Sequence, residues 1–305
     1  MSRRVRDAML AASNYTPISS IPLVDQLVAA GVALTDIYAY SPRKLYSAAT
    51  KGVSVRRSND NSVIDIGFDG SGNVNLSALS THVGANTGTV QTLYEQAGNA
   101  ANMTTGLTTR EMQVINAGAV RTAGNNNRLC LYVTASDMGY LTTMPTPITN
   151  ALNSAFMICS HNNAVTASVP RYLSLMTSAS TGDNASASTG VLICRNSSSS
   201  PTTAWSILRN GSVKGTVSGT FGQLDQIAAI HDGTNATMWL NNATSNAVGS
   251  GGSFNATRLV MGLTGSTFNM LPGAQISELI FLRTAANSTI RNIIHADQAS
   301  YYGVA

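Results

Sequence analysis

The chain is poor in charged and aromatic residues, which make up 10% and 6% of its 305 positions. Soluble domains carry about 25% charged residues, so other side chains must solvate this surface. Runs rich in Ser, Thr, Asn, Gly and Ala, at 177–190 and 195–204, can do so. Disorder of the whole chain is excluded, because disordered chains combine low hydrophobicity with high net charge. This chain is 43% hydrophobic with a net charge of +4.

The sequence also lacks a large cluster of Lys and Arg residues, despite its positive net charge. The densest cationic segment is SRRVRD, which holds Arg3, Arg4 and Arg6. Nucleic-acid binding requires clustered cations interleaved with stacking aromatics, so no nucleic-acid partner is expected. The three arginines indicate instead a contact patch for a protein partner.

Long hydrophobic runs are absent, and no stretch approaches the roughly 18 apolar residues that span a bilayer. No signal-peptide pattern opens the chain. The sequence therefore predicts no membrane contact and assembly in a cytoplasm, with export by another route left open.

Cysteine and histidine are too few and too scattered to form a recognisable site. Cys130, Cys159 and Cys194 are odd in number, widely spaced and set in apolar runs, which favours small buried side chains over a metal motif or a disulfide framework. The four histidines, His82, His161, His231 and His295, match no catalytic or metal-ligand spacing. No cofactor and no metal are expected.

The first 34 residues have a helical pattern unlike the remainder. Helices are predicted over Ser2–Ala12 and over Pro22–Ala30, where Pro22 suits a first turn and Gly31 a C-terminal stop. The linking segment contains two prolines, so residues 1–34 are predicted to form a helical N-terminal arm that anchors the protein. Its proposed docking residues are Arg3, Arg4, Val5, Arg6, Met9, Leu23 and Leu27.

Residues 35–305 read as one all-β domain, because short apolar or alternating runs are separated by Gly, Asn, Ser and Asp. An Asp232–Gly233 turn is predicted between two strands of a meander. A closing helix is predicted within 284–302, with Asn287 or Ser288 as N-cap. The clearest strands are at 53–57, 128–133, 155–159, 172–176, 190–195, 204–209, 257–263 and 275–283, with the strand-turn-strand meander at 226–243.

Four ordered motifs in residues 36–104 resemble the catalytic domain of α-L-arabinofuranosidase B. They are Tyr40-Ser41-x-Arg43-x-Leu45, Arg56-Arg57-Ser58-x-Asp60, Asp65–Phe68, and Tyr94-Glu95-Gln96-Ala97-Gly98-Asn99, which departs from the family pattern at two places. The match covers about a quarter of the chain.

The later half, HDGTNATMWLNN followed by ISELIFLR and a helix ending Tyr-Tyr-Gly, resembles the end of concanavalin-like jelly rolls. Together these resemblances imply a concanavalin A-like jelly-roll sandwich with an N-terminal helical arm and a C-terminal helix. Domains of this kind also resemble bacteriophage virion and tail proteins.

The resemblance makes glycoside hydrolysis the first enzymatic hypothesis. A retaining glycosidase needs two carboxyl groups roughly 5–5.5 Å apart. The family nucleophile is a Glu in the middle to later part of the domain, but no Glu occurs between Glu111 and Glu278; the adjacent cysteines of the family are also missing. Asp183 and Asp232 stand in turn-like contexts, and Asp225 is the remaining acidic residue between Asp137 and Glu278.

Other motif residues have structural explanations. Arg56 and Arg57 are predicted to form an ion-pair network with Asp60 and Asp65. The segment DGSGN at 69–73 is predicted to be a hairpin turn, with a calcium loop as the alternative.

These observations predict a non-enzymatic bacteriophage virion structural protein, a head-decoration, collar or tail-associated subunit. It would dock on other virion proteins, form a homo-oligomer and reside in the virion. The first alternative is a carbohydrate-binding module for host-surface glycans, for which the candidate residues are Trp205, Trp239, Tyr301 and Tyr302. The second is a divergent glycoside hydrolase.

Overall fold

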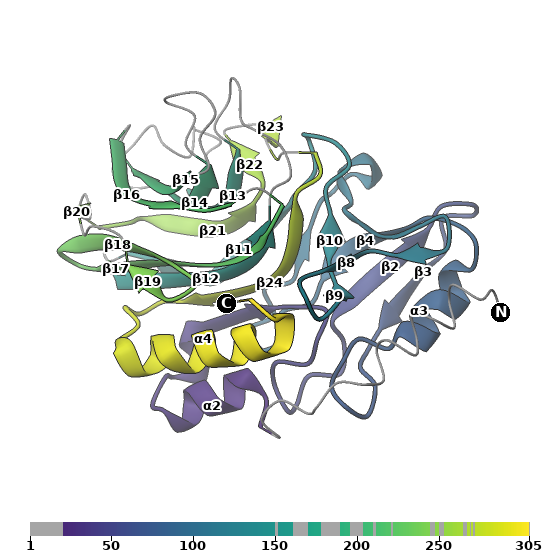
Figure 1. Ribbon diagram of the computed structural model, residues 1–305, viewed down its shortest axis with the longest axis horizontal. Helices are drawn as coiled ribbons and strands as arrows, with labels where there is room; N and C mark the ends of the chain where they lie inside the picture. The colour runs from purple at the N-terminus through teal and green to yellow at the C-terminus, as the bar shows by residue number, and fades with distance from the viewer. Residues whose placement is uncertain are drawn as a thin grey trace.

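A computed structural model describes most of the chain (Figure 1). No helix within this described part is long and apolar enough to cross a bilayer. The described residues are 21–149, 152–160, 170–177, 190–195, 204–209, 212–220, 222–244, 248–249, 253–264, 267–268, 270 and 272–304.

One layer of the molecule is built around β24, which joins segments from both ends of the chain. Strand β24 pairs antiparallel with β1 on one side and with β12 on the other, and β12 continues into β17 and β18. Bounds in this layer are β1 Ile37–Tyr40, β12 Leu152–Ser160, β17 Leu224–Asp232, β18 Asn235–Leu240, β19 Ala243–Thr244, β20 Val248–Gly249 and β24 Gln275–Leu282.

The second layer runs from the β13–β16 region to the β2–β4 region through β21, β11 and β5. Its bounds are β2 Val53–Arg57, β3 Val63–Ile66, β4 Gly88–Leu93, β5 Met103–Thr104, β6 Gln113–Asn116, β7 Ala119–Val120, β10 Leu131–Tyr132, β11 Tyr140–Ile148, β13 Arg171–Met176, β14 Gly190–Arg195, β15 Ala204–Arg209, β16 Ser212–Ser218 and β21 Ala256–Met261. Two small hairpins are formed by β8 Thr122–Ala123 with β9 Arg128–Leu129, and by β22 Leu263–Thr264 with β23 Thr267–Phe268.

Strand β24 is apolar on both faces because each face is covered. Leu279 and Phe281 belong to the large core between the layers, whereas Ile280 and Leu282 join a second core under the helices. Side chains alternate between the faces of a strand, so a strand buried on both sides reads as a continuous apolar run. This explains the apolar run LIFL at 279–282.

Two helices cover the outer face of the first layer. Figure 1 shows α4, Ser288–Tyr302, lying beneath the sheet with α2, Leu23–Ala29, packed against it. Asn287 caps α4 by accepting a hydrogen bond from the backbone N–H of Ile290 at 3.0 Å. The remaining helical elements are α3 Leu76–Val83, η1 Leu34–Asp36 and η2 Thr108–Arg110.

The predicted all-β sandwich with a C-terminal helix is confirmed, and the architecture is that of a jelly-roll-like fold. Of the proposed arm, residues 1–20, including Arg3, Arg4, Val5, Arg6 and Met9, lie outside the described residues. Assigning Leu23 and Leu27 to partner docking was wrong, because both are fully buried inside this chain. Their side chains belong to the apolar core between α2, α4 and the sheet.

Candidate functional site

Trp205 of β15 and Asp225, near the start of β17, form a buried pair. The indole Nε1 of Trp205 donates a hydrogen bond to Asp225 Oδ2 at 2.8 Å, and Tyr172 packs edge-on against the indole with ring centroids 4.8 Å apart. Both members of the pair are almost fully buried. A Cβ on Gly219 would lie 2.7 Å from Trp205 Nε1 and 2.8 Å from Asp225 Oδ2, so the close backbone approach here requires glycine.

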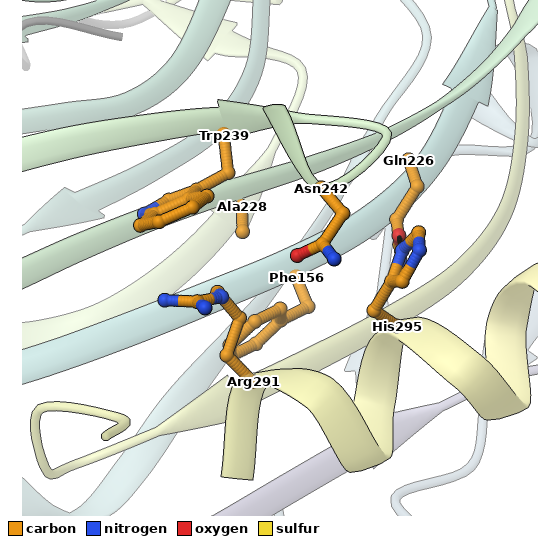
Figure 2. Close-up of a pocket in the computed structure, with 7 residues that line it drawn as sticks. All are labelled: Phe156, Gln226, Ala228, Trp239, Asn242, Arg291 and His295. Atoms are coloured by element: carbon orange, nitrogen blue, oxygen red, sulfur yellow. Dashed lines mark hydrogen bonds between the residues drawn. The ribbon is translucent and has the colours of Figure 1, made fainter. Parts of the chain in front are cut away.

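A second polar constellation lies on the other face of β17, between the sheet and α4 (Figure 2). Arg291 lies over the ring of Trp239, with the guanidinium carbon 3.7 Å from the ring centroid. Asn242 and His295 point toward the same space, as Figure 2 shows. The residues lining this pocket are Phe156, Gln226, Ala228, Trp239, Asn242, Arg291 and His295.

The pocket is connected to a buried ion-pair cluster by side-chain hydrogen bonds. Gln226 Nε2 donates to Gln298 Oε1 at 2.6 Å, and Gln298 Nε2 donates to Glu278 Oε1 at 3.0 Å. Glu278 in turn accepts two hydrogen bonds from Arg43, which also contacts Asp297. The charges of Glu278 and Asp297 are therefore neutralised mainly inside the protein.

Tyr301 and Tyr302 belong to the same buried cluster and present no exposed ring to a sugar. The guanidinium carbons of Arg43 and Arg128 lie 4.4 and 4.0 Å from the centroid of the Tyr301 ring. The Tyr302 hydroxyl donates to the carbonyl of Ser277 at 3.1 Å. Burial raises the pKa of Tyr301 to about 12. Of the four aromatic residues proposed for carbohydrate binding, Trp239 is the one that lines a pocket; Trp205 is buried as well.

The arginines of the second motif have different partners from each other. Arg57 forms a bidentate pair with Asp60, with Nε–Oδ1 and Nη2–Oδ2 distances of 3.1 and 2.5 Å, as predicted. Arg56 instead contacts Glu111, with Nε–Oε1 at 3.1 Å. Asp65 accepts hydrogen bonds from Lys51 and from the Tyr94 hydroxyl, so the single four-residue network expected from the sequence was wrong.

The fourth motif holds neighbouring backbone segments in position. Gln96 Nε2 donates to the carbonyls of Ser41 and Arg43 at 2.8 and 2.9 Å, and its Oε1 accepts from the Leu45 N–H at 2.7 Å. Glu95 accepts from three backbone N–H groups, those of Ala39, Ala97 and Asn99. Gln96 and Glu95 therefore stabilise the backbone arrangement of these segments.

Two acidic residues form local turns. Asp232 Oδ1 accepts from the N–H groups of Thr234 and Asn235 at 2.9 and 2.6 Å, which confirms the predicted turn. Asp69 accepts from Ser71 and Asn73 in the same manner, so DGSGN is a turn. No group of three or more potential metal-ligating side chains occurs within the described ranges.

Sequence reasoning missed Arg43 with Glu278 and Asp297, and the Gln226–His295 contact. One signal was available in α4, where Asp297 and Gln298 occupy positions on the buried face that also carries Ile290 and Ile294. Polar residues on the buried face of a helix indicate partners in the interior.

Three solved structures share this fold across most of the chain. An arabinofuranosidase complexed with arabinofuranosyl-α-1,2-xylobiose matches with a TM-score of 0.73 and 15% identity over 92% of this chain and 65% of that one. A GH54 α-L-arabinofuranosidase soaked with a cyclic sulfate inhibitor gives 0.74 and 16% over 92% and 66%. A mutant GH54 α-L-arabinofuranosidase soaked with 4-nitrophenyl α-L-arabinofuranoside gives 0.72 and 15% over the same shares.

This likeness establishes the fold and the structural similarity that the sequence motifs implied. The chain spans a little under two thirds of the length of these proteins. No family model matches the sequence. No curated protein sequence matches it.

The comparison contradicts two predictions made from the sequence. The structures that share the fold over 92% of the chain are glycoside hydrolases, and nothing points to a bacteriophage particle, so the virion structural role was wrong. The expectation of a protein without enzymatic activity is overturned by the same finding.

Proposed function

We propose that this protein is a glycoside hydrolase that acts on arabinofuranosides or closely related furanosides. The observation that carries the proposal is the shared fold over 92% of the chain with arabinofuranosidases, one of them in complex with an arabinofuranosyl oligosaccharide. Because the identity is 15%, the substrate and the reaction are proposals and not properties transferred from those enzymes.

Asp225 is the carboxylate that we assign to the chemistry. It is held by the Trp205 indole N–H, close to the aromatic ring of Tyr172. It lies near the start of β17, beside the turn that contains Gly222.

Two other carboxylates described in the second half of the chain have structural roles. Asp232 is used by its turn, and Glu278 is closed in by Arg43. A two-carboxylate mechanism requires a second acid. Asp183 is the remaining acidic residue between Asp137 and Glu278; it lies outside the described residues and is named on the sequence alone.

The test is hydrolysis of 4-nitrophenyl α-L-arabinofuranoside by the full chain. Wild-type protein should release nitrophenol, and Asp225→Asn should abolish the release while the protein stays folded, because Asn Oδ1 can still accept the Trp205 hydrogen bond.

Asp232→Asn is the matched control, since it removes a carboxylate from a turn on the same strand and should retain activity. An inactive wild-type protein, tested with this substrate and with other nitrophenyl furanosides, would overturn the proposed function. A fully active Asp225→Asn variant would overturn the assignment of Asp225.

A further inference from the structure

The pocket under α4 combines a cation, an imidazole and two amides with an aromatic wall (Figure 2). It is separate from the proposed catalytic residue, because Asp225 and Gln226 are consecutive in β17 and therefore point to opposite faces of the sheet. Trp205 and Asp225 lie on the inner face, whereas Gln226 and Ala228 face α4. The pocket thus needs its own explanation.

Arg291 carries a charge that nothing in the described part of the chain neutralises. It forms no ion pair there, and its buried Nε has no hydrogen-bond partner. It lies near the start of α4, whose first turn contains no acidic residue. Helix N-termini favour negative charge, so a cation here raises the positive potential of the pocket further.

His295 is held in one tautomer by a chain of hydrogen bonds with a fixed direction. The chain ends at Glu278, which is paired with Arg43 and accepts from Gln298 Nε2 at 3.0 Å. Gln298 Oε1 consequently accepts from Gln226 Nε2 at 2.6 Å, and Gln226 Oε1 is turned toward His295 Nδ1. Nδ1 therefore carries the proton and donates it.

The other imidazole nitrogen is consequently an acceptor. Burial, and secondarily the charge of Arg291, lower the pKa of His295, so the ring is neutral at neutral pH. A neutral ring with its proton on Nδ1 offers Nε2 as an acceptor. Such an atom suits a hydroxyl group and does not suit an anion.

We propose that a sugar acid binds across the mouth of this pocket, whose enclosed space is about the size of one water molecule, with its carboxylate on Arg291 and a ring hydroxyl on His295 Nε2. Arginine is well matched to a carboxylate because its guanidinium is planar and always charged. Asn242 and the indole of Trp239 complete the polar and apolar contacts that carbohydrate sites combine. An inorganic anion would use the arginine but would leave the imidazole acceptor unused.

Two-dimensional NMR of the two indole N–H groups tests this proposal directly. The chain has two tryptophans, so Trp239 reports on the pocket while Trp205 serves as an internal control; Trp239→Phe assigns the signals. D-galacturonate should shift the Trp239 signal and leave Trp205 unchanged. D-galactose, which lacks the carboxylate, and acetate, which lacks the hydroxyls, should each bind at least about tenfold more weakly, equal to losing one charge-assisted hydrogen bond.

Two variants locate the binding groups. Arg291→Gln should weaken D-galacturonate binding at least about tenfold, the value for one lost charged contact. His295→Phe should weaken it while leaving acetate binding little changed. The matched control is Arg121→Gln, which removes a guanidinium stacked on Tyr132 at 4.2 Å elsewhere in the chain and should bind as wild type does.

Equal responses to galacturonate and galactose would overturn the role of the carboxylate. Equal responses to galacturonate and acetate would overturn the sugar. An unchanged affinity in Arg291→Gln would overturn the location, and the absence of any response would overturn the site. Binding is read from the Trp239 signal and hydrolysis from nitrophenol release, so this inference and the proposed function can fail independently.

Discussion

Arg43 and Glu278 are joined by two hydrogen bonds, Nε–Oε2 at 2.7 Å and Nη2–Oε1 at 2.9 Å, although 235 positions separate them in the chain. Both side chains are buried, and Asp297 of α4 contacts the same guanidinium. The pair therefore fixes the segment after β1 to β24 and to the closing helix. Desolvation lowers the pKa of Arg43, but the two carboxylates outweigh it and raise the pKa well above its ordinary value.

Replacing Arg43 by Met should destabilise the protein by about 3–5 kcal/mol, because removal of one partner leaves buried carboxylates uncompensated. Urea unfolding measures the change. The control is Arg57→Met, which breaks the exposed pair with Asp60 and should have little effect. Equal effects of the two substitutions would contradict the role assigned to the buried cluster.

Gln96→Glu tests the fourth motif with almost no change in shape. The new carboxylate would direct an oxygen at the carbonyls of Ser41 and Arg43, where Nε2 now donates. A loss of about 1–3 kcal/mol is expected for polar groups left buried without a donor. Thermal denaturation measures it. Gln26→Glu, an identical change at a hydrogen bond that is exposed to solvent, should be nearly neutral, and a similar loss there would refute the explanation.

Stability should fall at alkaline pH because buried acids are kept neutral by the fold. Burial raises the pKa of the Cys130 thiol from 9.0 to about 12 and that of Tyr301 from 10.0 to about 12. Both groups ionise earlier in the unfolded chain, so their stabilisation is complete below pH 9 and is lost as pH rises toward 12. Urea unfolding at pH 8, 9 and 10 should show a progressive decrease.

The three cysteines should resist thiol reagents in the native protein. Cys130, Cys159 and Cys194 are buried thiols that form no disulfide, and thiolate formation controls reactivity. Colourimetric titration at pH 8 should detect almost no reaction before unfolding and three thiols in denaturant. Rapid labelling of folded protein would show that one of these sites opens.

Asn287→Ala should destabilise the protein by about 1 kcal/mol, the usual effect of losing an N-cap. The cap on Ile290 disappears, whereas Asn287→Asp preserves an acceptor and should be close to wild type. Asn75→Ala, which removes the equivalent cap from α3, provides a comparison of similar size. An Asp variant as unstable as the Ala variant would exclude capping as the cause.

Local sequence patterns predicted many strands, turns and helix caps, because these features depend on residues close together in the chain. The strand at 53–57, the Asp232–Gly233 turn and the Asn287 cap each depend on residues a few positions apart. The Arg43–Glu278–Asp297 cluster depends on contacts between distant segments, which composition and periodicity do not encode. Leu23 and Leu27 show the same limit, since an amphipathic helix does not indicate whether its apolar face meets its own chain or another.

The ladder between β1 and β24 has a consequence for synthesis on the ribosome. Residues 37–40 are made well before their strand partner, residues 279–282, so β1 must wait for the intervening chain before it can enter its sheet. Long-range pairing of this kind slows folding. Nascent chains that stop before residue 275 should therefore remain protease-sensitive and dependent on chaperones until the last strand emerges.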